Sequence, residues 1–299
     1  MSSATPIAMT MMRMAVIITT MAITTTTTPM FDYDFMRTAF AAAGIVAVLS
    51  GIVGFFLVLR GQTFAGHALS HVGFTGATGA VLFGLPPLAG LVGFTLLAGF
   101  GMGLLGEKFS ERDVAIGMML SLALGLGLLF LHFFTSYASQ AAALLFGNVL
   151  GVDNQALLSL AILAVISLVA LGFIARPLIF ASLQSELAEA RGVPLRFVST
   201  AFLMIVAIAV SECAQIVGVL LVFTLMVGPA AAALSFTRRL YAAVALSAAL
   251  ALLEAWGGLT LAFYSDWPVS FWITALSGLV YFASLVNWGG IGRGAATPA

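Results

Sequence analysis

Charged side chains are too scarce in this chain to cover a water-soluble surface. Only 7% of its 299 residues are Asp, Glu, Lys or Arg, whereas 62% are hydrophobic. A soluble domain carries roughly 25% charged residues, so most of this surface must face lipid. Backbone amides find no water inside a bilayer, and a spanning segment must therefore be a helix or part of a closed barrel. Apolar runs of about 20 residues without alternation indicate helices.

We therefore predict an all-α fold, a polytopic membrane bundle of about eight or nine transmembrane helices. Residues 1–34, rich in Thr and Met, are expected to form a poorly ordered leader, residues 35–290 a single transmembrane domain, and residues 291–299 a cytoplasmic tail. Residues 141–152 are too short to span and should dip into the membrane or lie at its surface. The candidate spans are 36–59, 63–84, 88–106, 114–134, 155–177, 196–212, 216–236, 240–264 and 269–288.

The placement of Lys and Arg predicts the orientation of these spans. If the spans alternate in direction, most basic residues fall on one side, which the positive-inside rule makes cytoplasmic. Arg13 and Arg37, both near the N-terminus, are the exceptions. The N-terminus is then outside and the C-terminus inside, unless the leader hides a tenth span. The basic residues on the cytoplasmic side are Arg60, Lys108, Arg112, Arg176, Arg191, Arg196, Arg238, Arg239 and Arg293.

Several functional classes are excluded or poorly supported by what the sequence lacks. The formal net charge is zero, so no nucleic-acid partner is expected. A single cysteine, Cys213, excludes intrachain disulfides and CxxC metal motifs. The chain has no GxxxxGK[ST] loop for ATP, no HExxH and no GxSxG. A proton-coupled carrier needs ionisable side chains within its spans, and this chain has one lysine and few acids there.

Two histidines interrupt the second candidate span, in the stretch GHALSHVGFTGATG (66–79). His67 and His71 are four residues apart and share one helix face, with Ser70 beside them. Two imidazoles at this spacing can bind one transition-metal ion, although two ligands leave it undercoordinated. The alternative is a packed pair that bonds neighbouring carbonyls. The glycines at 66, 73, 76 and 79 predict close helix packing.

Isolated acids form a second set of candidates. Glu254 lies well inside the eighth span, where a charged carboxylate costs about 2.5–3.5 kcal/mol, so it should face the protein interior. It is either a secondary polar contact for a cation or a protonated or hydrogen-bonded structural group. Glu212 lies near the expected outer end of the sixth span and is predicted to be wet. His132 is likewise predicted to be interfacial.

The link ASLQSELAEARGVPLR (181–196) has the start and stop signals of a short cytoplasmic helix. Ser182 or Ser185 is predicted to cap its start, while Gly192 ends it and Pro194 prevents its continuation. Such a helix is either a docking element for a cytoplasmic partner or a simple interfacial connector.

Five stretches, in this order along the chain, resemble the metal-ion permease family of ATP-binding-cassette importers, whose members carry zinc, manganese or iron. They cover parts of residues 35–288 and are GIVGFFLVLRGQTFAGHALSHVGFTG (51–76), ERDVAIGMMLSLALGLGLLF (111–130), LFGNVLGV (145–152), ELAEARGVP (186–194) and VGVLLVFTLMVGPAAAA (217–233). The resemblance implies a homodimer in the lipid of a bacterial cytoplasmic membrane. It also implies two cytoplasmic ATPase subunits, which bind the ATP, and an external metal-binding protein. The chain itself would be a pore and not an enzyme, with a transported metal and no resident cofactor.

The resemblance also assigns residues. His71 matches the histidine of the family's GDALSH-type motif, but His67 stands where an acid is usual. Two neutral imidazoles favour zinc over manganese, or else this branch does not retain bare-metal coordination. The expected metal path is thus His67 and His71, with Ser70 and Glu254 as secondary polar contacts. The expected ATPase-coupling residues are Glu189, Ala190, Arg191, Gly192 and Val193.

Two other classes stay open on the residues alone. A secondary transporter or cation channel would need no ATPase and would work as this chain alone in liposomes. A non-transporting membrane scaffold would use the two histidines only for packing and would show no metal-dependent phenotype.

Overall fold

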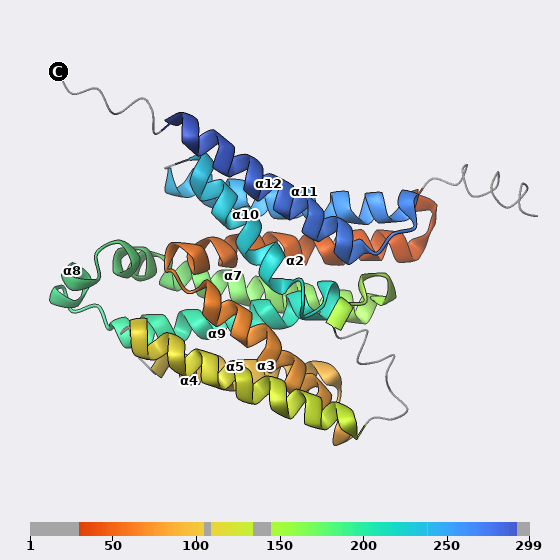
Figure 1. The fold of residues 1–299 in the computed structure, drawn as a ribbon, viewed down its shortest axis with the longest axis horizontal. Coiled ribbons are helices and arrows are strands. Elements are labelled where there is room, and N and C mark those ends of the chain that lie inside the picture. Colours follow the sequence, from red (N-terminus) through yellow and green to blue (C-terminus); the bar gives the residue numbers. More distant parts are fainter. Residues whose placement is uncertain (1–29, 105–108, 134–144, 238, 292–299) are drawn as a thin grey trace, which may run out of the picture.

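The computed structural model describes residues 30–104, 109–133, 145–237 and 239–291. All regular structure in these ranges is helical, which confirms the predicted all-α bundle (Figure 1). Most of the predicted leader (1–29) and of the predicted tail (292–299) lies outside the described residues. The elements are η1 (Met30–Asp32), α2 (Asp34–Leu59), α3 (Thr63–Leu82), α4 (Pro87–Leu104), α5 (Phe109–His132), η2 (Val149–Gly151), α7 (Asn154–Leu183), α8 (Ser185–Ala190), α9 (Leu195–Val217), α10 (Val222–Phe236), α11 (Leu240–Ser265) and α12 (Val269–Ile291).

Each predicted span corresponds to one helix among the described residues. Six of these helices, α2, α4, α5, α7, α9 and α11, are long and apolar enough to cross a membrane by themselves. The other three are α3, which carries the polar stretch around the histidines, α10, which has 15 residues, and α12, which is apolar over Val269–Leu285. α3 packs against α4, α5 and α9, and α10 packs against α2, α11 and α12.

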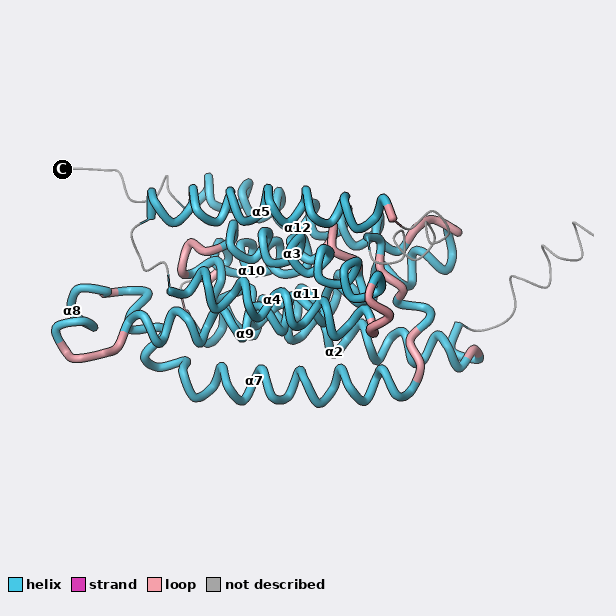
Figure 2. Tube along the Cα trace, turned by 90° about the horizontal axis from the view of Figure 1, so that it is seen from below, coloured by secondary structure: helices cyan, strands magenta, loops and turns pink. Residues whose placement is uncertain are grey.

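α2 is the central helix of the bundle. On one side of it lie α10, α11 and α12, and on the other lie α7 and α9, with α3, α4 and α5 farther out (Figure 1). The view from below places α5 and α7 at opposite edges of the bundle (Figure 2). The buried face of α2 runs from Ala39 to Leu57 and consists of small and branched residues together with Phe55 and Phe56.

Glycines let these helices approach each other closely. A Cβ atom at Gly54 would collide with the backbone carbonyl of Met226 in α10, and one at Gly76 would collide with the carbonyl of Gly90 in α4. A Cβ atom at Gly66 would lie 2.6 Å from Leu57 Cδ2. These contacts confirm the close packing predicted for the glycines of α3.

The two ends of the bundle differ in chemistry. α2 begins and α11 ends at one end, whereas α8 lies at the opposite end (Figure 1). The turn between α11 and α12 carries an aromatic cluster in which the rings of Trp267 and Trp272 stack with centroids 5.7 Å apart. Aromatic side chains of this kind are typical of a membrane–water interface. The assignment of either end to the cytoplasm stays a prediction.

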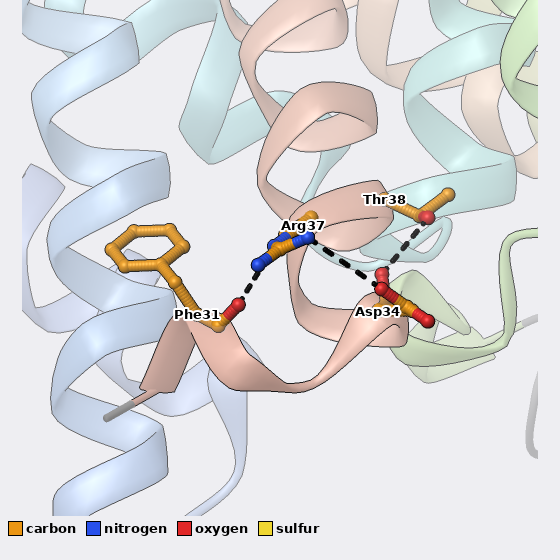
Figure 3. A network of polar contacts seen from close by, with 4 residues as sticks. All are labelled: Phe31, Asp34, Arg37 and Thr38. Carbon is orange, nitrogen blue, oxygen red and sulfur yellow. Dashed lines mark hydrogen bonds and ion pairs between the residues drawn. The ribbon is translucent and has the colours of Figure 1, made fainter. Parts of the chain in front are cut away.

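Arg37, an exception to the predicted basic side, is held within the first turn of α2. Its Nη1 lies 3.7 Å from Asp34 Oδ1, and its Nε donates to the Phe31 carbonyl at 2.7 Å (Figure 3). The Thr38 hydroxyl donates to the Asp34 carbonyl at 3.1 Å. Such an exposed ion pair adds little stability, but it places an opposite charge beside this arginine.

Candidate metal path

His67 and His71 lie side by side on α3. Their ring centroids are 4.8 Å apart with an interplanar angle of 82°, and both side chains are half-buried. The shared face predicted from their spacing is therefore present. Both rings are partly exposed, so another molecule or ion can reach them. Their role as metal ligands stays a prediction.

Ser70 is the least available of the predicted contacts. It is completely buried, and its hydroxyl donates to the His67 carbonyl one turn earlier, at 2.7 Å. The Ser70 hydroxyl is therefore already used in a hydrogen bond within α3. Ser70 is also buried, whereas the two imidazoles are partly exposed.

Phe223, which no sequence pattern singles out, contacts His67. This residue lies in the first turn of α10, and its ring meets the His67 ring edge-on at a centroid distance of 5.5 Å. Phe223 is hydrophobic and sits in an apolar span, so no local pattern distinguishes it from a core residue. Only the approach of α10 to α3 reveals the contact.

Phe223 follows directly after the break between α9 and α10. Gly218 ends α9 with φ of 90°, a conformation that favours glycine. The backbone of Gly147 lies directly against Gly218, and the Leu220 amide donates to the Leu145 carbonyl at 3.4 Å. Residues 145–152, the described part of the predicted dipping segment, therefore pack against this break.

A cavity of about 230 Å³ lies beside this segment. Its lining is mainly apolar and comes from the 146–150 stretch, the end of α9 and the turn between α11 and α12. It does not include His67 or His71, so it is separate from the candidate metal path.

One chain supplies few metal ligands. No group of three or more His, Cys, Asp or Glu side chains within the described residues could hold a metal ion. Within the described residues the structure therefore brings no third side chain of these types, Glu254 included, to the histidine pair.

Glu254 faces the protein interior, as its place in the span predicts. It is 2% exposed, and neither carboxyl oxygen has a hydrogen-bond partner among the described residues. The Ser277 hydroxyl of α12 lies close to the carboxyl but is directed at the Thr224 carbonyl of α10, 3.3 Å away. Glu254 thus lies where α10, α11 and α12 meet.

The prediction that Glu212 is wet is wrong. Its side chain is fully buried, and its carboxyl oxygens have no hydrogen-bond partner in the described part of the chain. The expected span ended at residue 212, whereas α9 continues to Val217 and is then covered by the 145–152 segment. His132, at the end of α5, is exposed, and its place at the membrane interface stays a prediction.

The predicted coupling segment contains a short helix, α8, at one end of the bundle (Figure 1). The helix spans only Ser185–Ala190, because α7 runs on to Leu183. The predicted serine cap is wrong: Gln184 precedes α8 without a side-chain cap, and the Ser182 hydroxyl donates to the Leu178 carbonyl.

The predicted stop of α8 is confirmed. Gly192 adopts φ of 78°, and its amide donates to the Glu189 carbonyl at 2.9 Å. The Val193 amide donates to the Ala188 carbonyl at 3.0 Å. The side chains of Glu189 and Arg191 are exposed, so this end of the bundle presents a defined polar surface.

Comparison with known proteins gives a consistent result. The model of the ABC 3 transport family matches residues 32–287. The chain is 30% identical over 233 residues to the manganese transport system membrane protein MntC of Listeria monocytogenes, covering 77% of this chain and 82% of that protein. It is 28% identical over 242 residues to a probable iron transport system membrane protein of Haemophilus influenzae, covering 79% and 87%.

A solved structure shares the fold. PsaBC from Streptococcus pneumoniae in complex with Fab superposes with a TM-score of 0.76 at 24% identity, covering 84% of this chain and 91% of that chain. At this identity the likeness concerns the fold alone.

Proposed function

The chain belongs to the ABC 3 transport family, and from this premise we propose that it is the permease subunit of an ATP-driven importer of divalent transition-metal ions. Relatives named for manganese and iron transport support the metal as substrate. The observation that carries the proposal is the half-buried His67–His71 pair next to the α9–α10 break. A chain-alone secondary transporter is the alternative, and family membership disfavours it.

The path requires more than one chain. Two imidazoles leave a metal ion undercoordinated, and the described residues bring no third His, Cys, Asp or Glu side chain to them. A second copy of the chain, related by twofold symmetry, would bring two more imidazoles to the ion. Binding at such a site must be transient, because a conducted ion has to leave. A homodimer with the metal passing between its two chains meets both requirements.

Zinc is the metal that this pair of ligands favours. Imidazole suits late first-row ions such as zinc, whereas manganese prefers carboxylate and water oxygens. No carboxylate lies with His67 and His71 in the described structure. Manganese is the second candidate, because relatives that match most of this chain are named for manganese transport.

ATP hydrolysis belongs to separate cytoplasmic subunits in this proposal. The exposed α8 and its stop at Gly192 form the surface on which an ATPase subunit would dock, with Glu189, Ala190, Arg191 and Val193 as the other coupling residues. Movement of α8 would be passed to α7 and α9, against which it packs. Access would thereby alternate between an external metal-binding protein and the cytoplasm, with the N-terminus outside.

Reconstituted transport tests this proposal. The permease and its ATPase subunits, in liposomes, should take up Zn²⁺ only with ATP, and His71→Ala should abolish uptake while the protein still inserts and assembles. Uptake by the chain alone, driven by an ion gradient, would support the secondary transporter instead. Unchanged uptake by the His71→Ala variant would remove the histidine pair from the path.

A further inference from the structure

The cavity of about 230 Å³ beside the 145–152 segment has an exposed mouth and a buried floor. At the mouth, Phe146 is 57% exposed and Leu150 is 45% exposed. The only polar side chains in the described lining are Asn148 and Ser270, and neither is charged. The buried residues of the floor come from α2, α9, α11 and α12 and are Ala43, Ile216, Val217, Ala255, Leu259 and Ile273.

Water is a poor occupant of this cavity. The Ser270 hydroxyl already donates to the Phe146 carbonyl at 3.1 Å, and Asn148 lies at the exposed mouth. The apolar side chains of the floor offer water no hydrogen bond. Because a buried water needs two to four polar partners, such a cavity stays dry or takes an apolar molecule.

The volume of the cavity limits what that apolar molecule can be. At about 230 Å³ it exceeds the apolar cavities of roughly 150 Å³ that bind benzene. It is smaller than the pockets of about 300–1,000 Å³ that hold drug-sized ligands. The cavity therefore has room for the end of one hydrocarbon chain.

The mouth of the cavity lies at the depth of the membrane surface. The backbone at Gly147 and Asn148 is not helical, and irregular backbone does not face the hydrocarbon layer of a bilayer. Trp267 and Trp272, which stack on each other, each adjoin a lining residue and are typical of the membrane–water interface. A phospholipid at this depth can keep its headgroup in the polar layer while one acyl chain enters the cavity.

The charges at this end of the bundle favour one kind of headgroup. Among the described residues, the exposed charged side chains here are Asp32, Asp34, Arg37, Asp153 and Asp266. Arg37 lies beside Asp34, so the remaining charge is negative. These aspartates repel an anionic headgroup, whereas a zwitterionic headgroup carries no net charge and has a cationic group to place near them.

We propose that this cavity binds one acyl chain of a zwitterionic phospholipid from the surrounding membrane, and that the chain holds the 145–152 segment against the break between α9 and α10. The segment contacts this break through Gly147 and Gly218, and it contacts α12 through Ser270. A chain in the cavity fills the space between these contacts, because the end of α9 and the start of α12 both line it. The lipid site is separate from the proposed metal path and does not depend on it.

Quenching of tryptophan fluorescence tests this inference. The purified full-length permease in mild detergent is titrated with phosphatidylethanolamine that carries bromine atoms on its acyl chains, because bromine quenches an indole in contact with it. The wild type should show saturable quenching, which the unbrominated lipid reverses by competition. Phosphatidylglycerol with the same chains should bind about tenfold more weakly at low salt, and added salt should reduce this difference.

Substitutions that fill the cavity locate the bound chain. Ala255→Leu fills the floor from α11 and should raise the lipid concentration for half-maximal quenching at least about tenfold, because methylene groups of the chain lose their buried place. Ala249→Leu is the matched control, since it adds the same group at an exposed position of α11 outside the cavity and should titrate as the wild type does. Thermal melting verifies that each variant is folded. Ala43→Leu fills the same space from α2 and replaces Ala255→Leu if that variant does not fold.

Three results would overturn the inference. Quenching of the wild type that neither saturates nor yields to unbrominated lipid would mean general contact with lipid and no site, whether or not the filling variants fold. Equal saturable quenching in the wild type and a folded filling variant would place the bound chain outside this cavity. Equal binding of the two lipids at low salt would remove the preference for a zwitterionic headgroup.

Discussion

The ring of Phe223 meets the His67 ring edge-on at a centroid distance of 5.5 Å and an interplanar angle of 81°. This contact joins α3, which carries both histidines, to the first turn of α10. α10 starts at the break that Gly218 and the 145–152 segment define. A change in the position of α10 would therefore move an aromatic ring against a candidate metal ligand.

Phe223→Ala should weaken the positioning of His67 without unfolding the protein. An aromatic pair contributes about 0.5–1.5 kcal/mol beyond area burial, so the metal concentration for half-maximal uptake should rise by about 2- to 12-fold. Uptake kinetics in liposomes give this value. Phe236→Ala is the matched control, because Phe236 is at the other end of α10 and both rings are 40% exposed. Equal effects of the two substitutions would contradict a specific role for Phe223.

His67→Asp should change which metal is carried. The substitution places a hard carboxylate oxygen beside His71. Carboxylate oxygens suit manganese, whereas imidazoles suit zinc. We expect the ratio of manganese to zinc uptake to rise on the order of tenfold, measured by competition between the two ions. His67→Asn, which adds oxygen without charge, should change the ratio less. A ratio unchanged in both variants would show that residue 67 does not contact the ion.

Gly192→Val should separate ATP hydrolysis from transport. A β-branched residue is strained at φ of 78° by about 1–3 kcal/mol, and relief of that strain would displace the end of α8. The variant should hydrolyse ATP with little metal uptake per ATP. Gly84→Val introduces similar strain at φ of 71° in the turn between α3 and α4 and should leave coupling intact. Normal coupling in the Gly192 variant would argue against docking at α8.

Gly54→Ala should destabilise the bundle by about 1–3 kcal/mol, because the added methyl group meets the Met226 backbone, which cannot move aside as a side chain can. Gly172→Ala in α7, where no atom lies within 4 Å of the added Cβ, should stabilise by roughly 0.5–1 kcal/mol. Thermal melting of the purified permease compares the two. A Gly54→Ala variant that melts at the wild-type temperature would mean that the contact between α2 and α10 is not tight.

Features that depend on local spacing could be predicted well. The four-residue interval between His67 and His71 fixes their shared face on any helix, and the structure shows the rings 4.8 Å apart. Gly192 and Pro194 ended α8 where expected, because glycine readily adopts the positive φ that stops a helix and proline lacks the amide hydrogen that would continue it. The serine cap failed because α7 extended through Ser182, a choice that depends on how α7 packs.

Features that depend on contacts between distant segments could not be predicted. Glu212 looked exposed because its span was expected to end there, and only the longer α9 and the segment packed on it bury the residue. The neighbours of Glu254 come from α10 and α12, about 23 to 30 residues away in sequence. No periodicity connects these positions.

By itself the sequence determined the solvent of this protein, its helical form and the order of its spans. Scarce charge leaves lipid as the only medium for so much apolar surface, and lipid requires backbone groups to bond within each helix. The tertiary structure alone decided which polar groups meet. It placed Phe223 against His67 and left the Glu254 carboxyl oxygens without a hydrogen-bond partner among the described residues. Glycine contacts such as Gly54 with Met226 fix how closely the helices pack and which faces turn inward.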